Sequence, residues 1–192
     1  QDLASIAKIE AMPLPPGMPT NRFPIEAMYH GSRVAPKGFT HVHHFFLPRA
    51  AQAMGMLWAA AQAHPDRRTR AFLLFMVEQA IWGMSVLARY APTHFSQVNQ
   101  YLNGVYYIAS QHAECSPWYI LGGKLDRLPK AFKTYHAVPG GASINTGTAA
   151  TLPLPDASVD YVFTDPPFGE NIYYADLNFL VESWHKVTTD AQ

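Results

Sequence analysis

The chain has 192 residues, and its hydrophobic content of 48% suffices for a folded core and excludes an intrinsically disordered protein. Its formal net charge of zero hides an asymmetry. Residues 1–150 hold 13 Lys and Arg against seven Asp and Glu, whereas residues 151–192 hold one Lys against seven acids. A basic body beside an acidic segment is compatible with nucleic-acid binding. The one cysteine, Cys115, excludes an internal disulfide and a multi-cysteine zinc ribbon within this chain.

The first segment, residues 1–46, is rich in proline, and we expect it to wrap over a neighbouring surface with at most a turn of helix at Leu3–Ile9. Three histidines, His41, His43 and His44, lie near its end. No acid or cysteine lies nearby in the sequence to complete a metal shell. We therefore expect a structural or hydrogen-bonding role for them and no metal. A metal-dependent enzyme that uses the three histidines is an alternative, which bound metal would establish.

Residues 47–135 are predicted to be mainly helical, with two consecutive helices at the start. The first runs from Pro48 to about His64, with the proline in its first turn, where a missing N–H is tolerated. The second runs from Arg67 to about Tyr90 and is apolar all round, which is typical of a helix buried between others. Polar residues at its centre argue against a membrane span, so we expect no membrane partner.

Basic residues mark two places in this helical region. Arg67, Arg68 and Arg70 begin the second helix, where cations oppose the helix dipole and favour an external anion such as a DNA phosphate. A further amphipathic helix at 124–135 carries a basic face that suits a nucleic-acid backbone. The default interpretation at both places is ordinary solvated charge, and nucleic-acid contact is the alternative. Between the two, residues 104–109 are predicted to form a strand.

Residues 136–192 predict an α/β unit. Residues 143–147 indicate one strand, and the apolar, β-branched and aromatic run 159–163 indicates a buried strand. Asp165 follows this run, at the position where open α/β sheets place their ligands. A helix is expected from about residue 174 to 187, because its apolar residues recur at i, i+3, i+4 and i+7.

The corner Asp165-Pro166-Pro167-Phe168 carries the chemistry. Neither proline donates a backbone hydrogen bond, so the corner presents acceptors: the Asp165 carboxylate and the carbonyl groups beside it. Phe168 adds a flat apolar face. These groups suit a planar molecule with an –NH2 group, such as the exocyclic amine of a nucleobase. Accepting its N–H bonds would localise the lone pair of the nitrogen, which could then attack an electrophilic methyl group. A base within a duplex would first have to be flipped out.

Two stretches resemble one family. The corner Asp165-Pro166-Pro167-Phe168 looks like the catalytic motif of S-adenosylmethionine-dependent DNA amino-methyltransferases. The longer run from Asp165 to Phe179 is similar to the large adenine-specific DNA methylases that usually carry a zinc ribbon, some of which accompany anti-phage defence systems. The stretch from Ala35 to Ala50 is similar to the same family. The resemblance implies a partial Rossmann-like class I methyltransferase sheet in residues 136–192, with a mainly helical insertion or accessory part.

The resemblance also implies an activity and catalytic residues. The activity is methylation of an exocyclic amine in DNA, adenine N6 ahead of cytosine N4, with S-adenosyl-L-methionine as the cofactor. Asp165 would orient the amine, Pro166 would add a carbonyl acceptor, Pro167 would keep the corner rigid, and Phe168 would stack on the base. Methylases of RNA or of protein amides usually have Asn at the position of Asp165, which favours DNA as the partner.

Further site residues follow from the same resemblance. Asn171, Tyr173 and Tyr174 would line the base pocket, and Gly147 with Thr148 would contact the methyl donor, although related enzymes often have an acid after the glycine. The glycine-rich donor turn of the family is absent from this sequence. We therefore expect an internal fragment whose partner is the remainder of the full-length methylase. The isolated chain is expected to be inactive, and the location is expected to be cytoplasmic.

A different class of function stays open. The chain could be a non-catalytic DNA-binding or assembly module in which the methylase segment is vestigial. Methylation at cytosine C5 is disfavoured, because that reaction needs a cysteine nucleophile and Cys115 lies far from Asp165 in the sequence. Loss of methylation in an Asp165→Ala variant that still binds DNA would favour the enzyme over the module.

Overall fold

The computed structural model describes residues 2–28, 34–90, 106–136, 140–145, 147–148, 150–166 and 173–187. Helices dominate these residues, and no β-strand occurs among them. Two isolated bridges, Arg22 with His41 and Arg89 with His112, are the β-type pairings in the described part. The prediction of an α/β fold with a Rossmann-like sheet is therefore wrong for this part of the chain.

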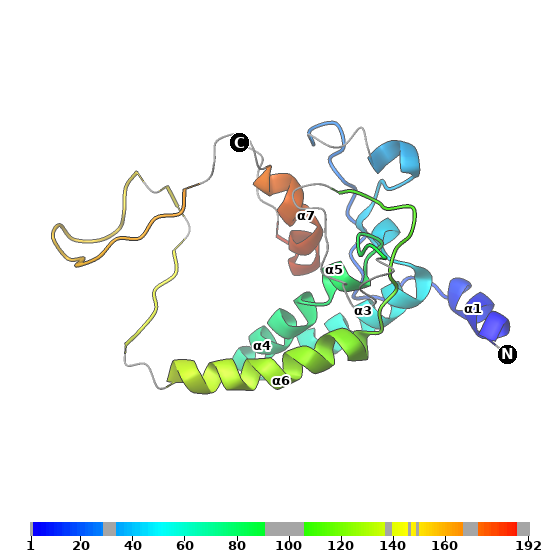
Figure 1. Cartoon of the computed structure of the whole chain (residues 1–192), viewed down its shortest axis with the longest axis horizontal. Helices are drawn as coiled ribbons and strands as arrows, with labels where there is room; N and C mark the ends of the chain where they lie inside the picture. Colours follow the sequence, from blue (N-terminus) through cyan, green and yellow to red (C-terminus); the bar gives the residue numbers. More distant parts are fainter. Residues whose placement is uncertain are drawn as a thin grey trace.

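The helices follow the chain in the order shown in Figure 1. They are α1 (Asp2–Glu10), the 3₁₀ helices η1 (Ala35–Lys37) and η2 (Val42–Phe45), α3 (Pro48–Gln62), α4 (Arg67–Glu78), α5 (Ile81–Met84), α6 (Pro117–His136) and α7 (Tyr174–His185). Within the described ranges, no helix combines the length and the apolar character needed to cross a membrane.

The segment before α3 crosses that helix at very short range. A Cβ atom added to Gly55 of α3 would lie 2.3 Å from Cγ of Pro15, and one added to Gly17 would lie 2.3 Å from the Gly55 carbonyl oxygen. Because both residues lack a side chain, the two backbones can approach each other there. Phe23, further along the segment, is 1% exposed and inserts its ring into the core.

The predicted helix from Pro48 is confirmed as α3, with the proline in its first turn. The predicted long helix from Arg67 to Tyr90 is wrong in its extent, because α4 ends at Glu78 and the chain turns before α5 begins. It is also not buried all round, since Phe72 and Phe75 of α4 are 41% and 45% exposed. The turn places Ile81 of α5 in the core, at 0% exposure.

Helix α6 begins at Pro117, so it is longer than the predicted helix 124–135 and includes it. It lies beside α4 with the opposite chain direction (Figure 1). Two contacts define this pairing. The rings of Phe72 and Phe132 lie 4.8 Å apart between centroids, and Nζ of Lys124 donates to Oε1 of Gln79 over 3.2 Å.

The predicted strands are absent from the described residues. Residues 106–109, 143–145 and 159–163 have extended or irregular backbone without strand pairing. Figure 1 shows the described residues of the segment 140–166, yellow to orange, lying away from the helices. Every described residue of that segment is exposed, including Tyr161 at 78% and Phe163 at 80%. A β-branched and aromatic run favours extended backbone, but a strand also needs a paired neighbour and a covered face, and the described residues supply neither.

The predicted helix after the motif is confirmed as α7. Its apolar stripe faces the body, with Leu180 at 0% and Trp184 at 1% exposure. The Trp184 ring lies 5.3 Å from that of Trp58 on α3, between centroids. At the far end of α7, Nε2 of His185 lies 2.8 Å from a carboxylate oxygen of Glu78, which links α7 to the end of α4.

Candidate functional site

The catalytic corner predicted from the sequence lies at the end of the exposed segment. Asp165 and Pro166 are both exposed, while Pro167, Phe168 and Asn171 lie outside the described residues. The described part of the chain gives the Asp165 carboxylate no hydrogen-bond or ion-pair partner. Its oxygens are therefore open acceptors, but the buried strand that was expected to position them is not formed.

The two predicted pocket tyrosines lie at the start of α7. Tyr173 is the residue before the helix and is half-buried, and its carbonyl oxygen accepts a hydrogen bond from the N–H of Leu177 over 3.1 Å. Tyr174 is the first helical residue and is 48% exposed. Because α7 docks on the body of the protein, the body fixes the end of the motif that follows the corner.

The predicted donor-binding residues lie on the same exposed segment as Asp165. Gly147 and Thr148 are both exposed, and the N–H of Ala150 donates to Oγ1 of Thr148 over 3.2 Å. A Cβ atom added to Gly147 would meet no atom within 4 Å, so the backbone is not pressed against any surface there. No hydrogen bond among the described residues joins these two residues to Asp165 or Pro166. They do not form a cradle for S-adenosylmethionine in the described part of the chain.

The structure does bring the two family-like stretches together. The ring of Phe46, from the stretch 35–50, lies 5.6 Å from that of Trp184 on α7, between centroids. Phe23 lies between the stretch 35–50 and α7. Its ring centroid is 5.0 Å from that of Phe45 and 4.8 Å from that of Phe179. The helix that follows the Asp-Pro-Pro-Phe motif is thus anchored on the other stretch through a shared aromatic cluster.

One residue of this cluster was not singled out from the sequence. Tyr106 is 4% exposed, and its hydroxyl group donates to the carbonyl oxygen of Asp176 and accepts the N–H of Leu180, both on α7. Burial raises the pKa of this hydroxyl, so it stays protonated and remains a donor. The apolar run around Tyr106 could have indicated a buried segment, but nothing in it indicates a contact with a helix some 70 residues further along.

The three histidines lie together in and beside η2. The rings of His43 and His44 are 4.3 Å apart between centroids, and His41 lies within 5.6 Å of both. Nδ1 of His44 is 2.9 Å from the carbonyl oxygen of Gly38. Burial, with the charges of His44 and His41, lowers the pKa of His43. Among the described residues, no group of three or more His, Cys, Asp or Glu side chains is arranged to hold a metal ion.

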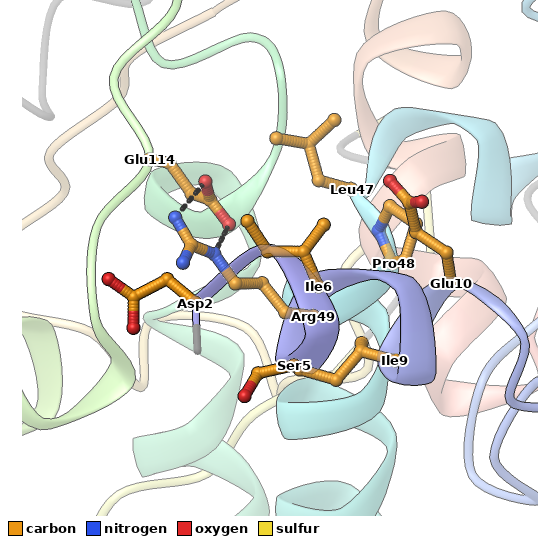
Figure 2. Close-up of a pocket in the computed structure, with 9 residues that line it drawn as sticks. All are labelled: Asp2, Ser5, Ile6, Ile9, Glu10, Leu47, Pro48, Arg49 and Glu114. Atoms are coloured by element: carbon orange, nitrogen blue, oxygen red, sulfur yellow. Dashed lines mark hydrogen bonds and ion pairs between the residues drawn. The ribbon is translucent and has the colours of Figure 1, made fainter.

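A cavity of about 500 Å³ lies elsewhere, between α1 and the start of α3 (Figure 2). Ile6 and Ile9 of α1 and Leu47 beside α3 supply apolar groups to its wall. The guanidinium of Arg49 forms a two-bond pair with the carboxylate of Glu114, with one N–O distance of 2.5 Å. Because Glu114 neutralises Arg49, the described residues of the wall offer an anion no free cation. None of the site residues predicted from the sequence lines this cavity.

Comparisons with protein-family models, with curated proteins and with solved structures found no match for the chain. The methylase interpretation therefore rests on the two stretches of sequence alone.

Proposed function

We propose that this chain supplies the base-binding corner of a DNA amino-methyltransferase, which methylates adenine N6 in preference to cytosine N4. The run from Asp165 to Phe179 is the single observation that carries the proposal. Two features of the structure support it. The Asp165 carboxylate is exposed, and the helix that contains the end of the run is anchored on the second family-like stretch through Phe46 and Trp184.

The proposed role of the corner is to bind and orient an amino group. The Asp165 carboxylate and the Pro166 carbonyl oxygen accept the two N–H bonds of a flipped-out base, and Phe168 stacks on its ring. These contacts hold the amine and concentrate the lone pair on its nitrogen, which is catalysis by positioning and electrostatics. The carboxylate would also accept the proton that the amine loses as its nitrogen bonds to the methyl carbon, while the sulfur–methyl bond of the donor breaks and the thioether product leaves.

The methyl donor requires a second surface. S-adenosylmethionine supplies an electrophilic methyl group, but Gly147 and Thr148 form no cradle for it in the described part of the chain. We therefore assign donor binding to the remainder of a longer methylase, acting in the cytoplasm. The partners of the chain in this proposal are that remainder and DNA.

The test is an Asp165→Ala variant of the methylase that contains this chain. Transfer of labelled methyl groups to DNA should fall to background, because the amine loses its main acceptor, while DNA binding should stay unchanged. Asp160→Ala is the matched control, since it removes another exposed acid five residues earlier and should leave methylation intact. Unchanged methylation in the Asp165 variant would refute the proposal.

One observation favours a second candidate, a non-catalytic DNA-binding or assembly module. The described residues form helices without a sheet, and the Asp165 segment rests on no surface among them. A module of this kind would bind DNA or a protein partner with its helical body, and Asp165→Ala would then change no activity. The same pair of variants therefore separates the two candidates.

A further inference from the structure

The start of α4 and the last turns of α6 together form one end of a helix pair. The contact between Phe72 and Phe132 places the first two turns of α4 beside the last turns of α6. Figure 1 shows the two helices side by side with this end away from α5. We call residues 67–72 and 127–135 the basic end.

The basic end concentrates positive charge. It contains the cations Arg67, Arg68, Arg70, Arg127, Lys130 and Lys133, and no Asp or Glu occurs in its two ranges. Asp66 and Asp126 border the ranges, and Asp66 is engaged as the cap of α4, where its side chain accepts the N–H of Thr69. The ion pairs found in the described part of the chain all lie elsewhere. The two lysines are exposed, so their charges face solvent.

Aromatic rings lie among these cations. Tyr135 is 75% exposed, and Phe72 and Phe132 are 41% and 37% exposed although they contact each other. The guanidinium carbon of Arg68 lies 6.0 Å from the centroid of Phe72. Exposed rings beside unneutralised cations are the combination that binds unpaired bases by stacking and their phosphates by charge.

We propose that the basic end binds single-stranded nucleic acid. Charge complementarity selects a polyanion, because six cations outnumber the two bordering acids. The exposed rings select unpaired bases, since a duplex keeps the faces of its bases stacked on one another. This inference goes beyond the proposed function and does not need Asp165, which lies outside the basic end.

The charge test measures binding of the full chain to a labelled oligothymidine of about 15 nucleotides by fluorescence anisotropy. The double variant Lys130→Gln/Lys133→Gln should weaken binding by about fivefold or more, and the slope of log K against log salt should become shallower by about 0.7 for each phosphate that is no longer neutralised. Lys8→Gln/Lys186→Gln is the matched control, because it removes the same charge from two other exposed sites. Equal weakening by both double variants would refute a specific site.

The stacking test uses Tyr135→Ala, which should weaken binding about tenfold with an unchanged salt slope. Trp118→Ala is its control, because Trp118 is exposed to a similar extent, 77%, at the other end of α6. Binding that is tighter to a duplex of the same length than to the single strand would overturn the proposal. An Asp165→Ala variant should bind the oligonucleotide normally whether or not the methylase proposal holds. A failure of the single-strand proposal can therefore be told apart from a failure of the methylase proposal.

Discussion

The Tyr106 hydroxyl joins the core to α7 at two backbone positions. It donates to the carbonyl oxygen of Asp176 and accepts the N–H of Leu180. The ring of Tyr106 also meets that of Phe23 edge-on, with centroids 5.2 Å apart. Since a buried polar group that loses its partner costs free energy, the hydroxyl helps to determine where α7 docks.

Tyr106→Phe should lower the free energy of unfolding by about 1–2 kcal/mol, because the backbone groups of α7 lose a buried partner while the ring is retained. Urea unfolding followed by circular dichroism measures the change. Tyr107→Phe is the matched control, since Tyr107 is 50% exposed and water can satisfy its hydroxyl. An equal and small effect in both variants would show that the Tyr106 hydroxyl does not stabilise the docking of α7.

At the scale of single residues, the sequence indicates only chemistry that is local, and the role of Asp165 in a site stays a prediction. The identity of Asp165 as an acceptor follows from its own side chain and from the prolines after it. The role of Tyr106 could not be predicted, because it depends on a helix distant in sequence. The same holds for Arg49, whose partner Glu114 lies 65 residues away.

At the scale of elements, helices were easier to predict than strands. The start of α3 and the apolar stripe of α7 are determined by nearby residues: a proline at the first turn, and a repeat of about 3.6 residues. The end of α4 was not predicted, because the apolar pattern continues past Glu78 while the backbone turns. Whether residues 159–163 become a strand depends on a partner strand, which no local pattern specifies.

The glycines of α3 and α6 give a test at this scale. Gly55→Ala should destabilise the fold by about 1–3 kcal/mol, because the new methyl group would overlap Pro15 in the crossing segment. Gly122→Ala is the matched control within α6, where a Cβ atom would meet nothing within 4 Å. It should stabilise the protein by about 0.5–1 kcal/mol, because alanine is the better helix former.

Thermal and urea unfolding of the two variants decide the outcome. If Gly55→Ala were as stable as the wild type, the segment around Pro15 would not cross α3 at the short range that the structure shows. A loss of stability in Gly122→Ala would instead mean that this face of α6 is covered.

At the scale of the whole molecule, the helical body and the segment 140–166 differ in how they are held. The body shares one hydrophobic core, to which α7 contributes Leu180 and Trp184. Within the described residues, segment 140–166 makes no backbone–backbone hydrogen bond and buries none of its side chains. The apolar run before Asp165 thus has the composition of a core strand but is exposed. This explains why an α/β fold was predicted from the sequence and does not occur among the described residues.

This contrast predicts where a protease cuts first. Brief digestion of the folded chain with chymotrypsin should cleave after Tyr161 or Phe163 before any site in the helical body, because a protease needs exposed and extended backbone. Leu152 and Leu154 should resist, since a proline follows each of them. Tyr119 is the matched control, because it is 57% exposed but its backbone belongs to α6. Mass spectrometry of the first fragments identifies the site. First fragments that are cut after Tyr119 but not after Tyr161 or Phe163 would show that residues 159–163 are covered in solution.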